Sequence, residues 1–387
     1  MKKKVKLGLD VFLERFIDRY RGSRVGLVTN ATGIDSELRR NIDLFVEKGL
    51  KLVKLFGPEH GVFTAAADGE KVSDSIEPRY GIVVHSLYGD RIKPTREMIS
   101  DLDVLIYDIQ DVGLRFYTYI YTMAYCMEEC GISKVKFIVL DRPNPLSRKV
   151  EGPTIKREFE SFVGGYGLAL RYGLTPAELA NYLNQRFSMN VELETVTMEN
   201  YDPDGYYDET NLLWNTPSPN LPSFEHAVLY VGFCLLEGVN VSVGRGTTHP
   251  FKYIGAPWID SQRLYKEMRK FHHDGVAFRE RTFVPYAFKL AGQVCHGLEF
   301  FVLDKRRIKP LHLAIDLIAI LKRIHPDQFR WDSYVHDETE RYYFDLLIGD
   351  DLYRKAIDEG ATSKDFDKIW NEESQLFASM VEEYRLY

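Results

Sequence analysis

The sequence lacks the short motifs by which common cofactor-dependent and metal-dependent enzymes are identified. It has no GxGxxG after its first predicted strand, no GxxxxGKS or GxxxxGKT, no HExxH and no GxSxG. Such motifs supply glycine turns that approach phosphates and histidine pairs that bind zinc. Their absence removes the usual support for a dehydrogenase, a P-loop enzyme or a zinc peptidase, and we expect neither a cofactor nor a metal.

Cysteine is scarce, and long apolar runs are missing. The four cysteines form no CxxC and are scattered, apart from one pair at helical spacing: Cys126, Cys130, Cys234 and Cys295. That distribution favours reduced, buried thiols over a disulfide framework, and with them a cytoplasmic protein. No uninterrupted apolar run of about 18 residues occurs, so we expect no membrane-spanning helix.

The amino terminus is basic but does not follow the pattern of a signal peptide. It begins MKKKVKLGLDVFLERF, in which Asp10, Glu14 and Arg15 interrupt the apolar stretch that a signal peptide requires. We interpret it as an amphipathic helix and expect a cytoplasmic location, unless a leader has been removed. The formal net charge is -7, so the global field attracts neither nucleic acid nor an anionic membrane.

The chain is long enough for two hydrophobic cores. At 387 residues it exceeds the size that one core usually organises, and 45% of its residues are hydrophobic. Residues 199–225 are rich in Pro, Asp, Asn and Tyr, as in a long connection between domains. We predict one domain over 1–225 and a smaller α/β domain over 226–387, and the oligomeric state stays open.

The first half alternates β-rich runs with amphipathic stretches, which is the pattern of a mostly parallel sheet covered by helices. The predicted strands cover residues 25–30, 51–57, 81–89, 104–111, 136–145 and 191–198. We also predict a helix over 116–130 that Gly131 ends, and a helix over 175–187 that begins with a Thr cap and a Pro. The second half is mixed, with helices near 225–236, 260–271, 310–324 and 363–385 and strands near 282–303.

Polar residues follow the apolar run of most predicted strands in the first half. They are Asn30; Glu59 and His60; Tyr88 and Asp90; Asp108 and Asp111; and Asp141, Arg142 and Asn144. Parallel strands deliver their carboxyl ends to one edge of a sheet, where the ligands of open α/β sheets bind. Any one of these residues could be a turn or cap residue, but together they predict a binding site at this edge.

The segment GPEHG at 57–61 holds two of these residues on a short turn. Pro58 breaks the strand, and Gly61 permits a tight return of the backbone, with Glu59 and His60 between them. A carboxyl group on a rigid turn at a strand end suits general acid or base catalysis. We therefore select Glu59 and His60 as catalytic candidates.

A later strand end carries two aspartates in the segment YDIQDVGLRFYTY at 107–119. Asp108 and Asp111 are followed by Arg115 and Tyr117. One aspartate can pair with Arg115 while the other faces a ligand, and one can equally cap the helix that follows. We favour Asp111 as the cap and Asp108 as the group that faces the ligand, because Asp108 stands nearer the strand. Both are taken as catalytic candidates.

A glycine-rich segment in the second half, EGVNVSVGRGTTHPF at 237–251, places Arg245 between two glycines. Such a loop can offer N–H groups and a guanidinium to a carboxylate or phosphate, although Gly-Arg turns are also common loop material. The full set of candidate substrate-binding residues is Asn30, Tyr88, Arg115, Tyr117, Arg142, Asn144, Glu237, Asn240 and Arg245.

These segments resemble the exo-β-N-acetylmuramidase family, formerly a domain family of unknown function. The matching blocks are VGLVTNATG, LFGPEHGVF, SLYGD, DIQDVGLRFYTY, VLDRPNPL, VEGP, SPNLP, EGVNVSVGRGTTHPF and GAPWID, with looser similarity beyond them. The resemblance implies a Rossmann-like amino-terminal domain and a smaller α/β domain that closes a cleft. It also implies removal of terminal N-acetylmuramic acid from the non-reducing ends of peptidoglycan fragments, with Glu59 as the catalytic residue.

The candidate residues fit this chemistry. Glycoside hydrolysis needs carboxyl groups and sugar-binding side chains but no cofactor. N-acetylmuramic acid carries a lactyl carboxylate, which Arg245 or Arg142 could bind through a bidentate contact. The stereochemical course stays open, because Asp108 could attack the sugar or could orient the substrate's own acetamido group.

Two rival functions remain. A non-catalytic protein that binds wall fragments would need the arginines and aromatic residues but would tolerate the loss of Glu59. A nucleotide-dependent enzyme could use the same kind of sheet, although the missing phosphate-binding motif argues against it.

Overall fold

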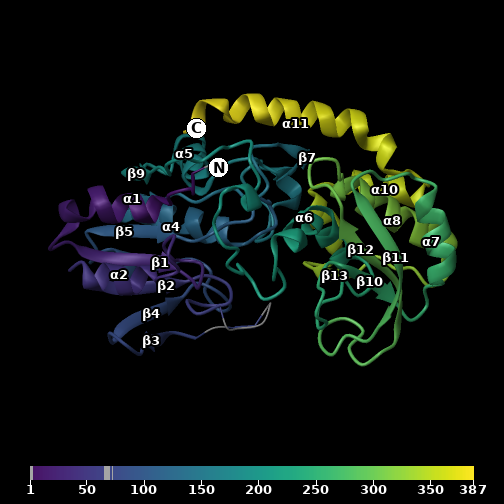
Figure 1. Ribbon diagram of the computed structural model, residues 1–387, viewed down its shortest axis with the longest axis horizontal. Coiled ribbons are helices and arrows are strands. Elements are labelled where there is room, and N and C mark those ends of the chain that lie inside the picture. The colour runs from purple at the N-terminus through teal and green to yellow at the C-terminus, as the bar shows by residue number, and fades with distance from the viewer. Residues whose placement is uncertain (1–2, 65–69, 72) are drawn as a thin grey trace. The chain divides into compact units, whose positions relative to one another are not determined.

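The computed structural model describes residues 3–64, 70–71 and 73–387 of the chain (Figure 1). The chain divides into two compact units, each assembled from segments that lie far apart in the sequence. Unit 1 consists of Met1–Lys149, Tyr172–Pro222 and Ala378–Tyr387, and unit 2 consists of Val150–Arg171 and Ser223–Phe377.

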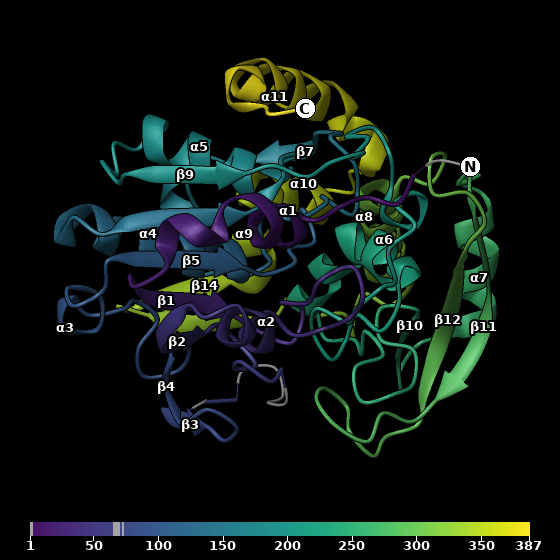
Figure 2. The same cartoon turned by 60° about the vertical axis from the view of Figure 1, so that its left-hand side comes forward.

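Unit 1 is built on a mostly parallel sheet. Its strand order is β3-β4-β2-β1-β5-β6-β9. Figure 2 labels all of these strands except β6, and the labels follow this order. The strands are β1 Arg24–Thr29, β2 Lys51–Gly57, β3 Ser75–Glu77, β4 Ile82–Ser86, β5 Val104–Asp108, β6 Lys136–Leu140 and β9 Leu193–Val196. Each pairing is parallel except that of the edge strand β3 with β4. The predicted fold class is therefore confirmed.

The central strands are continuous apolar runs because both faces of the sheet are covered. β5 (VLIYD) is buried along its whole length, and β1 (RVGLVT) is buried after its first residue. Helices α1 Gly8–Arg15 and α2 Asn41–Glu47 join the strands in one hydrophobic cluster, in which the rings of Phe12 and Phe45 lie 5.7 Å apart. Helices α4 Tyr119–Ser133 and α5 Pro176–Arg186 contact each other and β6.

Helices α4 and α5 differ in how well their ends were predicted. α5 begins as predicted, because the Thr175 hydroxyl accepts from the Glu178 N–H while the Glu178 carboxylate accepts from the Thr175 N–H. The predicted end of α4 at Gly131 was wrong, since this helix continues to Ser133. A Cβ at Gly131 would lie 2.1 Å from the carbonyl oxygen of Met189, so this glycine permits close packing and does not end the helix.

Unit 2 contains a three-stranded antiparallel sheet in the order β10-β12-β11, with β10 Tyr253–Ala256, β11 Val276–Phe283 and β12 Cys295–Val302. Its further strands form two small pairs, β7 Glu151–Thr154 with β8 Ala169–Arg171 and β13 Ser333–His336 with β14 Thr339–Tyr342. Its helices include α6 Phe224–Phe233, α7 Ser261–Arg269, α8 Pro310–Ile324, α9 Tyr343–Ile348 and α10 Leu352–Asp358. Helix α8 has the predicted bounds, whereas both strand pairs, α9 and α10 were not predicted.

The remaining helices are short or lie near the end of the chain. They are α3 Arg96–Ile99, α11 Asp367–Val381 and 3-10 turns at Ile17–Tyr20, Arg157–Phe159, Tyr207–Glu209, Cys234–Gly238, Ser363–Phe366 and Glu382–Tyr384. Within the described ranges, no helix combines the length and the apolar character needed to cross a membrane.

Asp141, which follows β6, fastens two distant segments of unit 1. It is completely buried, and its carboxylate accepts hydrogen bonds from the Thr175 hydroxyl at 2.9 Å, the Ala177 N–H at 2.9 Å and the Tyr387 hydroxyl at 2.8 Å. The carboxylate thus holds the start of α5 and the side chain of Tyr387. Burial, together with the nearby Glu178 charge, raises the pKa of Asp141 to about 7 despite these donors.

We predict that Asp141 makes the stability of the protein depend on pH. Between pH 4 and 7 the folded protein keeps a proton on Asp141 that the unfolded chain has released, so the free energy of unfolding should fall as pH rises through this range. The change is a few kcal/mol, at roughly 1.4 kcal/mol for each pKa unit. Urea denaturation of wild type and Asp141→Asn at pH 4.5, 6 and 7.5 tests this, because the variant should show a flatter dependence. Parallel curves for the two proteins would contradict it.

Candidate active site

Glu59 and His60 lie on a tight turn at the carboxyl end of β2. The turn is closed by a hydrogen bond from the Gly61 N–H to the Pro58 carbonyl at 2.9 Å. His60 and Gly61 both have left-handed backbones, with φ of 69° and 74°. His60 is buried, whereas Glu59 is half-buried and keeps part of its surface exposed. The turn therefore fixes the backbone of Glu59.

Two hydroxyl groups from other segments hold the Glu59 carboxyl. The Thr118 hydroxyl, at the start of α4, donates to Glu59 Oε2 at 2.6 Å. The Tyr88 hydroxyl, in the segment after β4, is hydrogen bonded to Glu59 as well, and burial together with the Glu59 charge raises the pKa of Tyr88. Tyr88 is half-buried. The Glu59 carboxyl thus joins the ends of β2 and β4 to the start of α4.

A layer of buried polar and aromatic side chains lies beside this carboxyl. The rings of Tyr117 and Tyr119 meet edge to face at 4.8 Å, and the Tyr119 hydroxyl donates to the Pro217 carbonyl at 2.6 Å. Burial raises the pKa of Tyr119, and the negative charge of Glu59 adds to the effect. Asn30 lies close to Tyr119, and its side-chain oxygen accepts from the Thr32 N–H at 2.9 Å.

Asp108 does not face open space. Its side chain is 0% exposed, and its two oxygens accept from Arg142 Nε at 2.6 Å and from Asn41 Nδ2 at 2.7 Å. Arg142 is also buried, and its Nη2 donates to the Ile34 carbonyl at 3.0 Å. We expected Asp108 to contact a ligand directly. The structure contradicts this expectation, because Asp108 is fully buried and both of its oxygens are bound by Arg142 and Asn41.

Asp111 does not cap helix α4, so that prediction was wrong. The residue at the cap position is Thr118, and the helix has no side-chain cap. Asp111 instead accepts from the Gly113 N–H at 2.6 Å and from the Tyr172 hydroxyl, which closes the loop between β5 and α4. Burial raises the pKa of Asp111 to about 6. The predicted cap is impossible because helix α4 starts eight positions beyond Asp111.

Other polar residues near the strand ends are buried, bind the backbone or form surface ion pairs. Arg115 is 0% exposed, although it lies in the loop that leads to α4. Asn144 accepts from the Leu146 N–H at 3.0 Å and donates to the Leu174 carbonyl at 2.9 Å, so both ends of its amide hold backbone. Asp90 lies on the surface in an ion pair with Lys71. The preference of Asn and Asp for turns explains such positions.

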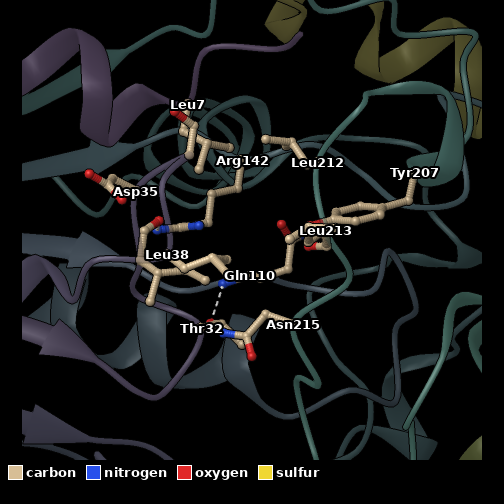
Figure 3. Close-up of a pocket in the computed structure, with 12 residues that line it drawn as sticks. Leu7, Thr32, Asp35, Leu38, Gln110, Arg142, Tyr207, Leu212, Leu213 and Asn215 are labelled. Carbon is tan, nitrogen blue, oxygen red and sulfur yellow. Dashed lines mark hydrogen bonds between the residues drawn. The ribbon is translucent and has the colours of Figure 1, made fainter.

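A small cavity lies next to Arg142 in unit 1 (Figure 3). Its volume is about 20 Å³, and its polar lining includes Thr32, Asp35, Gln110 and Asn215. The Thr32 hydroxyl accepts from the Gln110 N–H at 2.9 Å, as the dashed line in Figure 3 marks. A volume of this size holds about one water molecule and cannot hold a sugar ring.

In unit 2 the glycine-rich segment carries Arg245 in a rigid environment. Its guanidinium forms an ion pair with Glu237 and lies over the rings of Phe251 and Phe288, at 5.1 and 5.7 Å from their centroids. The side-chain amide of Asn240 binds backbone groups. It donates to the Gln328 carbonyl and accepts from the Arg330 N–H, each at 2.9 Å. Arg245 is thus held in place, whereas Asn240 joins two chain segments.

The described part of the chain contains no group of three or more His, Cys, Asp or Glu side chains placed to hold a metal ion. Thr118 contacts Glu59 but was not among the site residues predicted from the sequence. Its only signal was a threonine within the aromatic stretch FYTYIYT, where it was taken as part of the helix.

Comparisons with known proteins give a consistent result over the whole chain. Family models described as exo-beta-N-acetylmuramidase NamZ, N-terminal and C-terminal, match residues 25–225 and 228–387. The peptidoglycan beta-N-acetylmuramidase NamZ of Bacillus subtilis (strain 168) is 38% identical over 388 residues, which span 100% of this chain and 92% of that protein.

Two solved structures are also similar, both of DUF1343 family proteins from Bacteroides fragilis NCTC 9343. One has a TM-score of 0.89 and 32% identity over 99% of each chain. The other has a TM-score of 0.78 and 29% identity, over 100% of this chain and 99% of that one.

We predict that Asp108 matters for stability through Arg142. Asp108→Asn keeps the shape of the side chain but leaves the Arg142 guanidinium buried without a charged partner, which should cost about 3–5 kcal/mol of unfolding free energy. Urea denaturation measures this loss. The matched control is Asp18→Asn, which removes an exposed ion pair with Arg21 and should cost at most about 1 kcal/mol. Equally small losses in both variants would contradict a structural role for the buried pair.

Proposed function

The chain belongs to the exo-β-N-acetylmuramidase NamZ family, and on that premise we propose that the Glu59 carboxyl protonates the leaving group of the reaction. The protein is an exo-acting glycoside hydrolase that removes terminal β-linked N-acetylmuramic acid from the non-reducing ends of peptidoglycan fragments. The family resemblance of the sequence is thereby confirmed, and a purely sugar-binding function is excluded by the enzymatic assignment.

The environment of Glu59 is the observation that carries the proposal. A general acid must stay close to the glycosidic oxygen through bond cleavage, so its carboxyl group has to be both reachable and fixed. Glu59 is half-buried on a closed turn, and hydroxyl groups of Thr118 and Tyr88 hold its carboxyl. By contrast, Asp108 is completely buried.

The burial of Asp108 also bears on the second step of the chemistry. A carboxylate with no exposed surface and with both oxygens bound to Arg142 and Asn41 is poorly placed to attack an anomeric carbon. This supports a substrate-assisted course, in which the acetamido oxygen of the sugar attacks as Glu59 protonates the departing oxygen. Asp108 then contributes by holding Arg142 and the loops around it.

We further propose that Arg245 recognises the lactyl carboxylate that distinguishes N-acetylmuramic acid from N-acetylglucosamine. Its guanidinium is fixed by Glu237 and by two aromatic rings, so little conformational freedom is lost when a carboxylate binds. Arg142 is the weaker candidate, because it is buried and already paired with Asp108. The preferred substrates are then saccharides that end in N-acetylmuramic acid.

We predict that Glu59→Gln removes most turnover and leaves the fold intact. The amide cannot deliver a proton, and acid catalysis contributes about 10²–10⁴-fold to such reactions. The substrate is a disaccharide with N-acetylmuramic acid linked to a sugar, since a sugar oxygen is a poor leaving group. The control is Glu128→Gln, a partly exposed glutamate of α4, which should keep wild-type turnover. A Glu59→Gln enzyme with wild-type turnover on this disaccharide would end the assignment.

We predict that Arg245→Ala weakens the preference for muramides over glucosaminides. The loss of a charge-assisted contact to the lactyl carboxylate should lower kcat/KM for the β-N-acetylmuramide by about 10- to 100-fold, and leave the glucosaminide rate nearly unchanged. A matched control is Arg279→Ala on β11, because Arg279 is also paired with a glutamate, Glu299, and lies near a ring. Unchanged selectivity in Arg245→Ala would mean that another group binds the carboxylate.

A further inference from the structure

Thr118 occupies the cap position of α4 but does not cap the helix. Its backbone is helical, with φ −73° and ψ −18°, and its side chain makes no cap hydrogen bond. A capping threonine is normally extended, which turns its oxygen toward the N–H groups two or three residues on. At Thr118 the hydroxyl instead donates to Glu59 Oε2 at 2.6 Å. Thr118 therefore forms a hydrogen bond with a carboxyl group 59 positions away in the sequence and makes no helix-capping hydrogen bond.

The position of the Thr118 hydroxyl is tightly defined. Threonine is branched at Cβ, so it has few side-chain conformations, and Thr118 is only 9% exposed. The first turn of the helix is anchored by its neighbours, since the Tyr119 hydroxyl donates to the Pro217 carbonyl and the Tyr121 hydroxyl to the Arg115 carbonyl, both at 2.6 Å. The hydrogen-bond donor therefore belongs to a rigid part of unit 1.

The bond acts on the side chain of Glu59, which the backbone turn does not fix. The closed turn holds the backbone, but the last torsion of a glutamate side chain is broad and lets the carboxyl plane rotate. A hydrogen bond to Oε2 limits this rotation and so keeps the other oxygen in a constant direction. Proton transfer to a glycosidic oxygen depends on that direction, because it requires contact at hydrogen-bond distance.

We propose that Thr118 is a positioning residue that orients the Glu59 carboxyl for protonation of the leaving group. The proposal rests on the function proposed for Glu59 and adds a residue that acts only through it. A role in proton delivery has a chemical signature that a role in folding lacks. Leaving groups that depart readily as anions need little protonation, whereas a sugar oxygen needs the acid to be in place.

The test compares Thr118→Val, which removes the hydroxyl and keeps the shape, with Thr118→Ser, which keeps the hydroxyl. The matched control is Thr122→Val, one turn further along α4, because the Thr122 side chain is also buried and its hydroxyl oxygen has no hydrogen-bond partner. Each full-length variant is assayed on two β-N-acetylmuramides, one with 2,4-dinitrophenolate and one with N-acetylglucosamine as the leaving group.

Thr118→Val should lower kcat by about 10- to 100-fold on the sugar leaving group, with KM nearly unchanged, and by less than about threefold on dinitrophenolate. Thr118→Ser should recover most of the lost rate, and Thr122→Val should match wild type on both substrates. Equal losses on the two substrates, or no loss on either, would overturn the proposal. If Thr118→Val fails to fold by circular dichroism, Thr118→Ala is judged by the same criterion.

The variant Glu59→Gln is assayed on the same pair of substrates. It distinguishes the proposal for Thr118 from the proposal that Glu59 is the general acid. A selective loss in Glu59→Gln without one in Thr118→Val refutes only the role of Thr118. The absence of a selective loss in Glu59→Gln refutes Glu59 as the acid, and the positioning role of Thr118 with it.

Discussion

The buried ion pair between Asp108 and Arg142 is the interaction on which the carboxyl edge of the unit 1 sheet depends. It joins the end of β5 to the segment after β6, and further hydrogen bonds connect it to Asn41 at the start of α2 and to the Ile34 carbonyl after β1. Two charges without solvent are stable only when each compensates the other. The loops that leave β1, β5 and β6 are therefore held together at this pair, and the segment that carries Thr118 begins from one of them.

The extent of burial divides the polar residues at the strand ends into two groups. Asp108, Asp141 and Arg115 are completely buried, and the first two have their carboxylate oxygens bound by protein groups. Glu59 and Tyr88 keep part of their surface exposed, although other side chains contact them. A group that reacts with substrate must be fixed and reachable at once, and the end of β2 provides both conditions.

Much of the fold of unit 1 could be predicted because its signals are local. The β-rich runs predicted at 51–57 and 104–111 contain β2 and β5, and the Thr175 capping box starts α5 where expected. Predictions failed where a distant contact sets the local structure. Gly131 resembles a helix end but lies within α4, since it is needed for close approach to Met189. In unit 2 the strands β7, β8, β13 and β14 have only three or four residues each, which is too short for a sequence pattern to predict them.

The sequence by itself determined the parallel sheet, the rigid turn that carries Glu59 and, through its ordered motifs, the family. These features depend on residues that are adjacent in the chain. The tertiary structure decided which of the polar residues at the strand ends keep part of their surface exposed. Asp108 and Arg142 pair across 34 positions, and Thr118 reaches Glu59 across 59. Both the burial of a carboxylate and its hydrogen-bond donors come from packing between segments, which local composition and spacing do not encode.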